Sequence, residues 1–286
     1  MFDYIKMLII ALFSGIFSSI PLSSSLSFSF LNDILKFSNN SSEISFYFGI
    51  ISIIFAIVSA FYVRKIYLKG IKTVFSKKKN KKSTTYISYK NMLIGMLVSF
   101  LTSFAVLIPT SKERALSDIL VDYIADGNLI VGAFCAVASG IILFVAIWYC
   151  RQKNESKKRS SKATDSLRLA IYQIPVHIFP GFSNVSSAAV SLSLGGVDDR
   201  VIMREAFIYI SPSMFTVGVI RIVKALITGI TIDPIMLVIC VIFALIGNII
   251  MFSLVSKINI RKSYLFFAIL SIISGLFTAI AAFIVR

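Results

Sequence analysis

The chain has 286 residues, of which 57% are hydrophobic and 15% are charged, and its formal net charge at pH 7 is +16. This composition excludes a soluble globular domain and indicates an integral membrane protein. The positive charge does not indicate a nucleic-acid partner, because most lysines and arginines lie in short loops between apolar segments, where they orient helices and contact anionic phospholipid headgroups.

The apolar segments predict a bundle of helices. Each is about 20 residues long, which is the length of a helix that crosses roughly 30 Å of hydrocarbon. The first segment, residues 5–35, is interrupted from Pro21 to Ser25 and ends near Asn32 and Asp33. Because each of its arms is too short to cross the membrane comfortably, we expect a re-entrant hairpin.

Three full spans follow this hairpin, at residues 44–63, 91–109 and 128–150. The loop after the first span, up to Lys90, contains ten lysines and arginines and no acidic residue, which places it in the cytoplasm by the positive-inside rule. The loop 110–127 carries little positive charge and is expected outside. Between Arg151 and Lys162, six basic residues accompany one acidic residue, so this loop returns to the cytoplasm.

A second interrupted apolar region, residues 167–196, contains a run of proline, glycine and hydroxyl residues from Pro180 to Ser187. It predicts another re-entrant hairpin, which enters from the inside. Three further spans complete the chain, at residues 204–225, 235–254 and 264–284.

The chain therefore divides into two halves, 1–150 and 151–286, each with a broken hairpin and three spans. The expected fold is an all-α integral membrane protein with six transmembrane helices and two re-entrant broken hairpins. Since an odd number of spans reverses the orientation of the second half, we expect an inverted repeat with both termini outside. Interrupted backbone inside a membrane has to line a cavity, so the two breaks predict a site at mid-depth.

The residues at the breaks follow two patterns. The first runs Ser14, Ser18, Pro21 and then Ser23, Ser24, Ser25, Leu26 and Ser27; the second runs Pro180, Gly181, Phe182, Ser183, Asn184, Val185 and Ser186. They resemble the motifs of the undecaprenyl-pyrophosphate phosphatase, or bacitracin-resistance, family. That family has Glu, three residues, Glu, two residues, Pro, one residue, Ser-Ser-Thr-Gly-His in the first motif, and Pro-Gly-x-Ser-Arg-Ser-Gly in the second.

The resemblance implies a bacterial membrane enzyme that removes one phosphate from the polyprenyl carrier lipid of cell-wall synthesis. The charged residues of the motifs are replaced here, however. Both glutamates are serines, Ser14 and Ser18; the histidine is Ser27, and the arginine is Asn184. Cleavage of a phosphoanhydride needs positive charge or metal on the phosphoryl oxygens and a group that positions the nucleophile. The chain is therefore expected to be a catalytically degenerate member, a pseudoenzyme.

Neutral groups can still recognise a phosphate. Serine hydroxyls and backbone N–H groups at broken helix ends hold phosphate oxygens, helped by the positive end of the helix dipole. The candidate binding residues are Ser23, Ser24, Ser25, Ser27, Gly181, Ser183, Asn184, Ser186 and the only histidine, His177. For the serines, the alternative is a hydrogen bond to a helix carbonyl; for His177, it is a bond between helices. Arg221 and Lys224 are interpreted either as phosphate contacts or as anchors of a span end.

No residue is assigned as a catalytic nucleophile. The acidic, histidine and cysteine residues show no spacing typical of a metal site, and no cofactor is expected. Three functions stay open: a degenerate protein that binds or translocates a polyprenyl phosphate or pyrophosphate, an active phosphatase that uses other residues such as His177, and a membrane scaffold without a lipid substrate. Each of them places the chain in the bacterial plasma membrane, and the sequence does not indicate an oligomeric state.

Overall fold

The computed structural model describes residues 2–76, 84–109, 115, 119, 129–152, 163–197, 202–255 and 260–284. Over these residues the chain is mainly helical, and the rest consists of turns and irregular segments, with an isolated bridge between Pro109 and Ala115. The elements are α1 (Phe2–Ser18), α2 (Ser24–Leu35), α3 (Ser41–Phe75), α4 (Thr84–Thr102), the short 3-10 helix η1 (Ser103–Leu107), α6 (Ile130–Gln152), α7 (Ala163–Ile178), α8 (Asn184–Leu194), α9 (Ile202–Ile227), α10 (Pro234–Val255) and α11 (Ile260–Ile284).

The long helices have the length and composition of membrane spans. Among the described residues, five stretches qualify: Ser41–Phe75, Ser88–Leu107, Ile202–Ile227, Pro234–Val255 and Leu265–Phe283. The remaining predicted span, residues 128–150, corresponds to α6, which contains the shorter apolar stretch Ile130–Ala146. Large apolar side chains such as Phe134, Ile249 and Phe277 point outward from the bundle, where lipid rather than water is the suitable solvent. The chain is an all-α integral membrane protein, as predicted.

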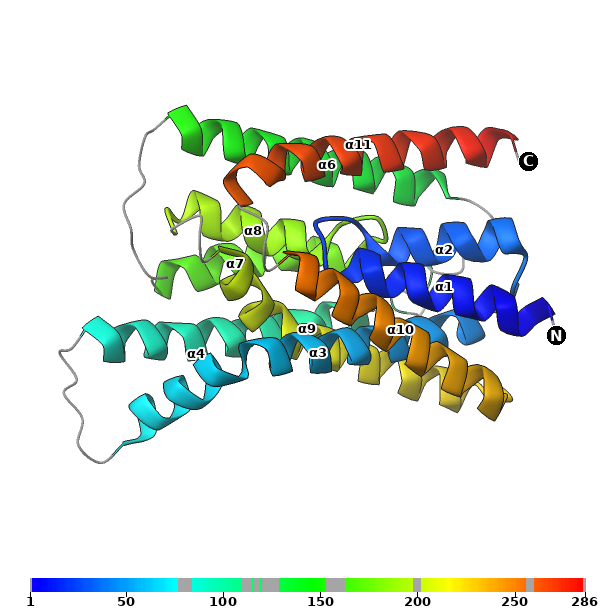
Figure 1. Ribbon diagram of the computed structural model, residues 1–286, viewed down its shortest axis with the longest axis horizontal. Coiled ribbons are helices and arrows are strands. Elements are labelled where there is room, and N and C mark those ends of the chain that lie inside the picture. Colours follow the sequence, from blue (N-terminus) through cyan, green and yellow to red (C-terminus); the bar gives the residue numbers. More distant parts are fainter. Residues whose placement is uncertain are drawn as a thin grey trace.

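The two interrupted regions form helical hairpins, α1–α2 and α7–α8, whose arms pack on each other. The arms have 17 and 12 residues in the first hairpin and 16 and 11 in the second. At 1.5 Å per residue, each arm is shorter than about 30 Å of hydrocarbon. In Figure 1 the loops of both hairpins, dark blue and light green, lie in the middle of the molecule rather than at its ends.

The first observed break is shifted toward the N-terminus relative to the predicted one, and the second is shorter than predicted. The first covers residues 19–23, so Ser24 and Ser25 already belong to α2. The second covers residues 179–183, so Asn184 opens α8 and the positions up to Ser187 form its first turn. Serine and asparagine favour helix starts as much as loops, and their hydroxyl and amide groups alone do not distinguish the two.

Glycines bring the long helices into close contact in pairs. A Cβ atom added to Gly49 of α3 would lie 2.9 Å from the carbonyl oxygen of Gly218 of α9, and one added to Gly218 would lie 2.7 Å from that of Gly49. In the α6–α11 pair, each helix has a glycine that faces the backbone of the other: a Cβ on Gly140 would lie 2.8 Å from Ala268 O, and one on Gly275 would lie 2.8 Å from Ala133 O. Small residues at such crossings let membrane helices pack backbone to backbone.

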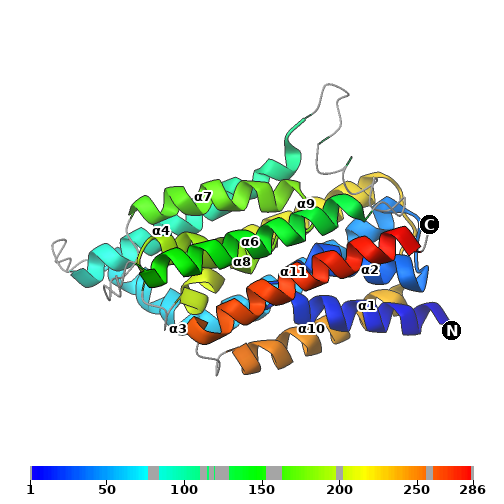
Figure 2. The same cartoon turned by 90° about the horizontal axis from the view of Figure 1, so that it is seen from above.

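The remaining helices form two further pairs. α1 packs on α10, and α7 packs on α4. Seen from above, these two pairs lie at opposite sides of the molecule, with α3, α9, α6 and α11 between them (Figure 2). The first hairpin thus packs against α10, a span of the second half, and the second hairpin packs against α4, a span of the first half.

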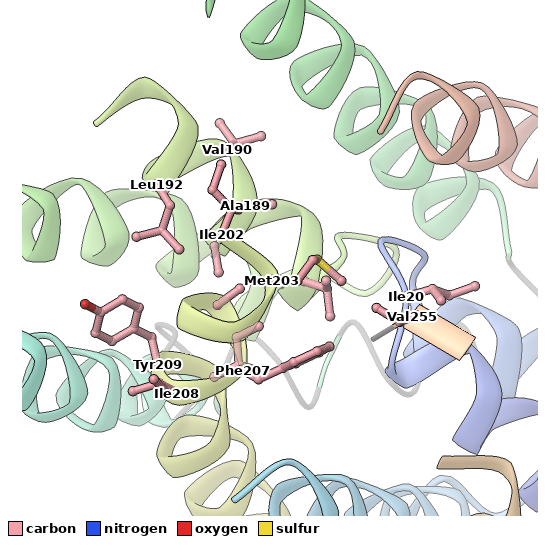
Figure 3. Packing of buried hydrophobic residues seen from close by; sticks show 14 of the residues in the cluster. Ile20, Ala189, Val190, Leu192, Ile202, Met203, Phe207, Ile208, Tyr209 and Val255 are labelled. Carbon is pink, nitrogen blue, oxygen red and sulfur yellow. The ribbon is translucent and has the colours of Figure 1, made fainter. Parts of the chain in front are cut away.

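A large hydrophobic cluster joins the first break to the second half. It contains Ile20 and Leu22 from the break, together with residues of α8, α9 and α10 that include Ala189, Phe207 and Val255. Figure 3 shows ten of its side chains by name, gathered between these elements. Because an irregular segment has no regular backbone pairing of its own, this apolar packing is what holds the first break in place.

Different helix ends form the two ends of the molecule. α1 begins and α11 ends at the same end, whereas α3 ends and α4 begins at the opposite one (Figure 1). The predicted outer loop 110–127 and the predicted cytoplasmic loop 151–162 lie almost wholly outside the described residues.

Candidate functional site

The first break is a tight turn stopped by proline and restarted by serine. α1 ends at Ser18, and Pro21 cannot donate a backbone hydrogen bond or continue the helix. Ser23 then caps α2: its backbone is extended, and its Oγ accepts a hydrogen bond from the backbone N–H of Leu26 at 3.2 Å. The Oγ atoms of Ser23 and Ser25 are 3.0 Å apart and share a further hydrogen bond.

The second break repeats this arrangement. Ser183 caps α8 with an extended backbone, and its Oγ accepts from the N–H of Ser186 at 3.2 Å. Gly181 has a φ of +106°, a region that side chains other than glycine rarely enter. A Cβ on Gly181 would also lie 2.1 Å from the carbonyl oxygen of Gly132 in α6. Glycine is therefore required here both by the backbone angle and by the packing.

The two breaks touch each other. The backbone N–H of Gly181 donates to Ser25 Oγ at 3.3 Å, and Ser186 Oγ donates to the carbonyl oxygen of Pro21 at 3.0 Å. Each break thus contacts the first turn of the helix that follows the other break. The N-terminal ends of α2 and α8, which are the positive ends of their dipoles, are brought together at one place.

Four buried polar atoms beside the breaks make no hydrogen bond within the protein. They are Ser14 Oγ, Gln173 Nε2, His177 Nε2 and Asn184 Oδ1. Buried polar groups are rarely left in this state, so each has capacity for a ligand or for solvent. Ser14 precedes Pro21 by the same number of residues as Gln173 precedes Pro180. The same holds for Ser18 and His177.

Among the described residues, the charge of Arg221 of α9 acts on the imidazole of His177. The Arg221 guanidinium lies 4.8 Å from the ring centroid of Phe48 of α3. His177 itself is buried, near the end of α7. The residues of the second break, 179–183, are uncharged.

Two other candidate residues near the breaks have their hydroxyl groups in hydrogen bonds within the protein. Ser27 Oγ donates to the carbonyl oxygen of Ser23 at 2.8 Å, which is the helix-carbonyl alternative considered for the serines. Ser18 Oγ donates to Gly15 O at 2.8 Å and to Asn248 Oδ1 at 3.0 Å, so it is directed toward α10. Ser24 is buried in the first turn of α2.

Two amide side chains that support the breaks were not predicted. Asn248 of α10 is fully buried, and its Oδ1 accepts hydrogen bonds from Ser18 and Ser19, each at 3.0 Å. Gln173 of α7 accepts from Ser99 Oγ of α4 at 2.7 Å through its Oε1. For Asn248 a signal existed, since an asparagine inside a 22-residue apolar helix indicates an interhelical hydrogen bond.

Within the described ranges, no three His, Cys, Asp or Glu side chains come together as a metal site. The expectation that the chain needs no metal or cofactor stays a prediction. The site is therefore a set of neutral hydroxyl, amide and backbone groups at two facing helix starts.

The site and the fold can be compared with known proteins. A search of curated proteins found no match. A family model described as "Bacitracin resistance protein BacA" matches residues 7–277. This match extends from α1 to α11, includes both breaks and confirms the resemblance seen in the motifs. The chain belongs to the bacitracin resistance protein BacA family.

Proposed function

We propose that this chain binds the phosphate-bearing head of a polyprenyl phosphate or pyrophosphate lipid at its two breaks. The observation that carries the proposal is the pair of reciprocal contacts, Gly181 N–H to Ser25 and Ser186 to Pro21 O. They bring two helix N-termini together, and helix N-termini favour anions through their free N–H groups and their dipoles. Family membership supports the choice of a polyprenyl pyrophosphate among possible anions.

We further propose that the chain holds this lipid without efficient hydrolysis. The positions of the family's charged residues carry Ser14, Ser18, Ser27 and Asn184. Neutral groups bind a phosphate, but they supply neither a base nor the charge that a phosphoryl-transfer transition state needs.

The hairpins give this site its proposed place in the membrane. Arms too short to cross, with loops in the middle of the molecule, are typical of re-entrant segments that meet near the midplane. Glycine contacts between α3 and α9 and between α6 and α11 support an inverted repeat of the two halves. Such a repeat gives a bound lipid head access from either side, which is why translocation belongs to the proposal. We place the chain in the bacterial plasma membrane with both termini outside.

The binding test uses a charge change that does not disturb the helix. Asn184→Asp puts a negative charge of nearly the same shape into the first turn of α8, where an acidic residue stabilises the helix. Repulsion of the phosphate should weaken binding of undecaprenyl phosphate at least about tenfold. Asn40→Asp is the matched control, because Asn40 caps α3 away from the breaks and aspartate caps equally well. Affinity is measured by native mass spectrometry of the purified protein. Equal affinity in both variants contradicts the proposed site.

A working phosphatase is the second candidate, and the action of the Arg221 charge on buried His177 is the observation in its favour. A histidine side chain is able to orient a phosphate and transfer a proton. The test is phosphate release from undecaprenyl pyrophosphate, with and without divalent metal, by the wild type and by His177→Ala and Ser24→Ala. Turnover that these changes abolish contradicts the degenerate function. Absence of both turnover and headgroup-dependent binding leaves only the scaffold.

A further inference from the structure

α3 is longer than the membrane requires. Its 35 residues make a helix of about 52 Å at 1.5 Å per residue, against roughly 30 Å of hydrocarbon. Its last part, residues 64–76, contains Arg64, Lys65, Lys69 and Lys72 and no acidic residue. Because charged side chains are costly in hydrocarbon, this part of α3 lies in the headgroup region.

One side of this segment packs against the protein. Val63 and Gly70 are buried, and a Cβ on Gly70 would lie 2.7 Å from the methyl carbon of Met92 and 3.0 Å from the ring of Tyr89. Both of these residues belong to α4. The orientation of the segment about its own axis is therefore fixed by α4.

The other side of the segment carries two exposed stripes. Leu68, Ile71 and Phe75 form an apolar stripe at spacings of three and four residues, and all three are exposed. Lys65, Lys69 and Lys72 form a second stripe at spacings of four and three. Residues spaced in this way lie on one side of a helix. An apolar stripe beside a basic stripe is the pattern of a helix that lies in a membrane interface.

The basic stripe borders an open cavity of about 640 Å³, lined by the three lysines together with Leu68, Thr73 and Ser76. Ammonium and hydroxyl groups are groups that bind phosphate. The described residues that line the hollow all belong to the last part of α3 and its C-cap. This part of α3 lies at one end of the molecule, whereas the two breaks lie in the middle (Figure 1).

We propose that the lysine-lined hollow at the end of α3 binds the phosphate headgroup of an anionic phospholipid. The charge is complementary, and Leu68, Ile71 and Phe75 supply the adjacent contact with acyl chains. A soluble anion would use the lysines and leave the apolar stripe without a partner, which favours a lipid over free phosphate.

The test compares phosphatidylglycerol with phosphatidylcholine bound to the purified full-length protein, measured by native mass spectrometry at increasing salt. The triple variant K65Q/K69Q/K72Q should lower the phosphatidylglycerol preference at least about tenfold, because each lysine near an anionic surface contributes about fivefold. The control K6Q/K36Q/R168Q removes the same number of charges from α1, the C-cap of α2 and α7 and should keep the preference. An unchanged preference in the first triple variant overturns the proposal.

A second comparison separates a lipid from a free anion. Phe75→Ser shortens the apolar stripe at an exposed position without touching the lysines. It should weaken phosphatidylglycerol binding several-fold and leave binding of inorganic pyrophosphate as it was. If pyrophosphate displaces phosphatidylglycerol completely and Phe75→Ser changes neither, the hollow is a site for a soluble anion, and the lipid proposal is wrong.

Discussion

Both the backbone angle and the packing at position 181 require glycine. Its φ is +106°, and the space where a Cβ would stand is taken by Gly132 O at 2.1 Å. Gly229, in the α9–α10 connection, has a φ of +76° but nothing within 4 Å of its Cβ position. The two glycines therefore allow the cost of the backbone angle to be separated from the cost of the contact.

We expect Gly229→Ala to lower the free energy of unfolding by about 1–2 kcal/mol, the cost of a side chain in the left-handed region. Gly181→Ala should lower it by a further 1–3 kcal/mol or so, because the second break would have to move away from α6. The measurement is unfolding of both variants by SDS in mixed micelles. Equal losses would mean that the contact with Gly132 contributes nothing.

Asn248 holds the end of the first hairpin from another helix. Replacing it by leucine keeps the size but leaves Ser19 Oγ without its acceptor and Ser18 with only Gly15 O. Hydrogen bonds between membrane helices contribute about 0.6 kcal/mol on average and up to about 1.7.

We therefore expect Asn248→Leu to destabilise the protein by about 1–2 kcal/mol. In a double-mutant cycle with Ser18→Ala and Ser19→Ala, part of this loss should disappear, since the changes remove the same bonds. Strict additivity of the three changes would show that the bonds do not contribute to stability.

At the scale of the helices, α3 and α9 are in direct backbone contact. Because Gly49 and Gly218 each face the other's carbonyl oxygen, a side chain on either one separates the two helices. Gly218→Leu should cost about 1–3 kcal/mol by overpacking, and adding Gly49→Leu should cost little more, since the crossing is already open. Val219→Leu is the control, because Val219 is 38% exposed on the same helix. The measurement is the midpoint of thermal unfolding of the three variants in detergent. If Gly49→Leu lowers the stability of the Gly218→Leu variant by as much again, the two glycines do not share one crossing.

The positions of the helices were predicted from the sequence more accurately than the residues at which the helices end. The predicted span at residues 44–63 is the apolar core of α3, which continues to Phe75. Hydropathy predicts the end of the apolar stretch, not the end of the helix. Lysine and arginine are good helix formers, so the helix continues beyond the apolar stretch. The break positions were predicted to within a few residues, because proline and glycine stop a helix wherever it lies.

The contacts that build the site were beyond sequence reasoning. Ser186 and Pro21 are 165 positions apart, and Ser18 and Asn248 are 230 apart. No local propensity encodes such pairs; they follow from how α1 packs on α10 and α8 on the first break. His177 was singled out as the only histidine, close to Pro180, and Arg221 was left open between a phosphate contact and an anchor of a span end.

For the whole molecule, the pairing of helices relates the two halves. α3 meets α9 and α6 meets α11 through glycines, while α1–α10 and α7–α4 form the two outer pairs. If each helix is replaced by its counterpart in the other half, the α3–α9 and α6–α11 pairs stay the same. The α1–α10 and α7–α4 pairs change places. This relation agrees with the proposed inverted repeat.

The orientation of the molecule gives the last prediction. Asn39, just before α3, and Ser76, just after it, are both exposed and lie at opposite ends of one span. The basic residues after position 63 assign Ser76 to the cytoplasm, so Asn39 should face outside. In a variant whose three native cysteines are replaced by alanine, Asn39→Cys should react with a membrane-impermeant maleimide in intact cells. Ser76→Cys should react only after the membrane is permeabilised. The reverse pattern would invert the topology, and with it the leaflet in which the lysines of α3 meet anionic lipid.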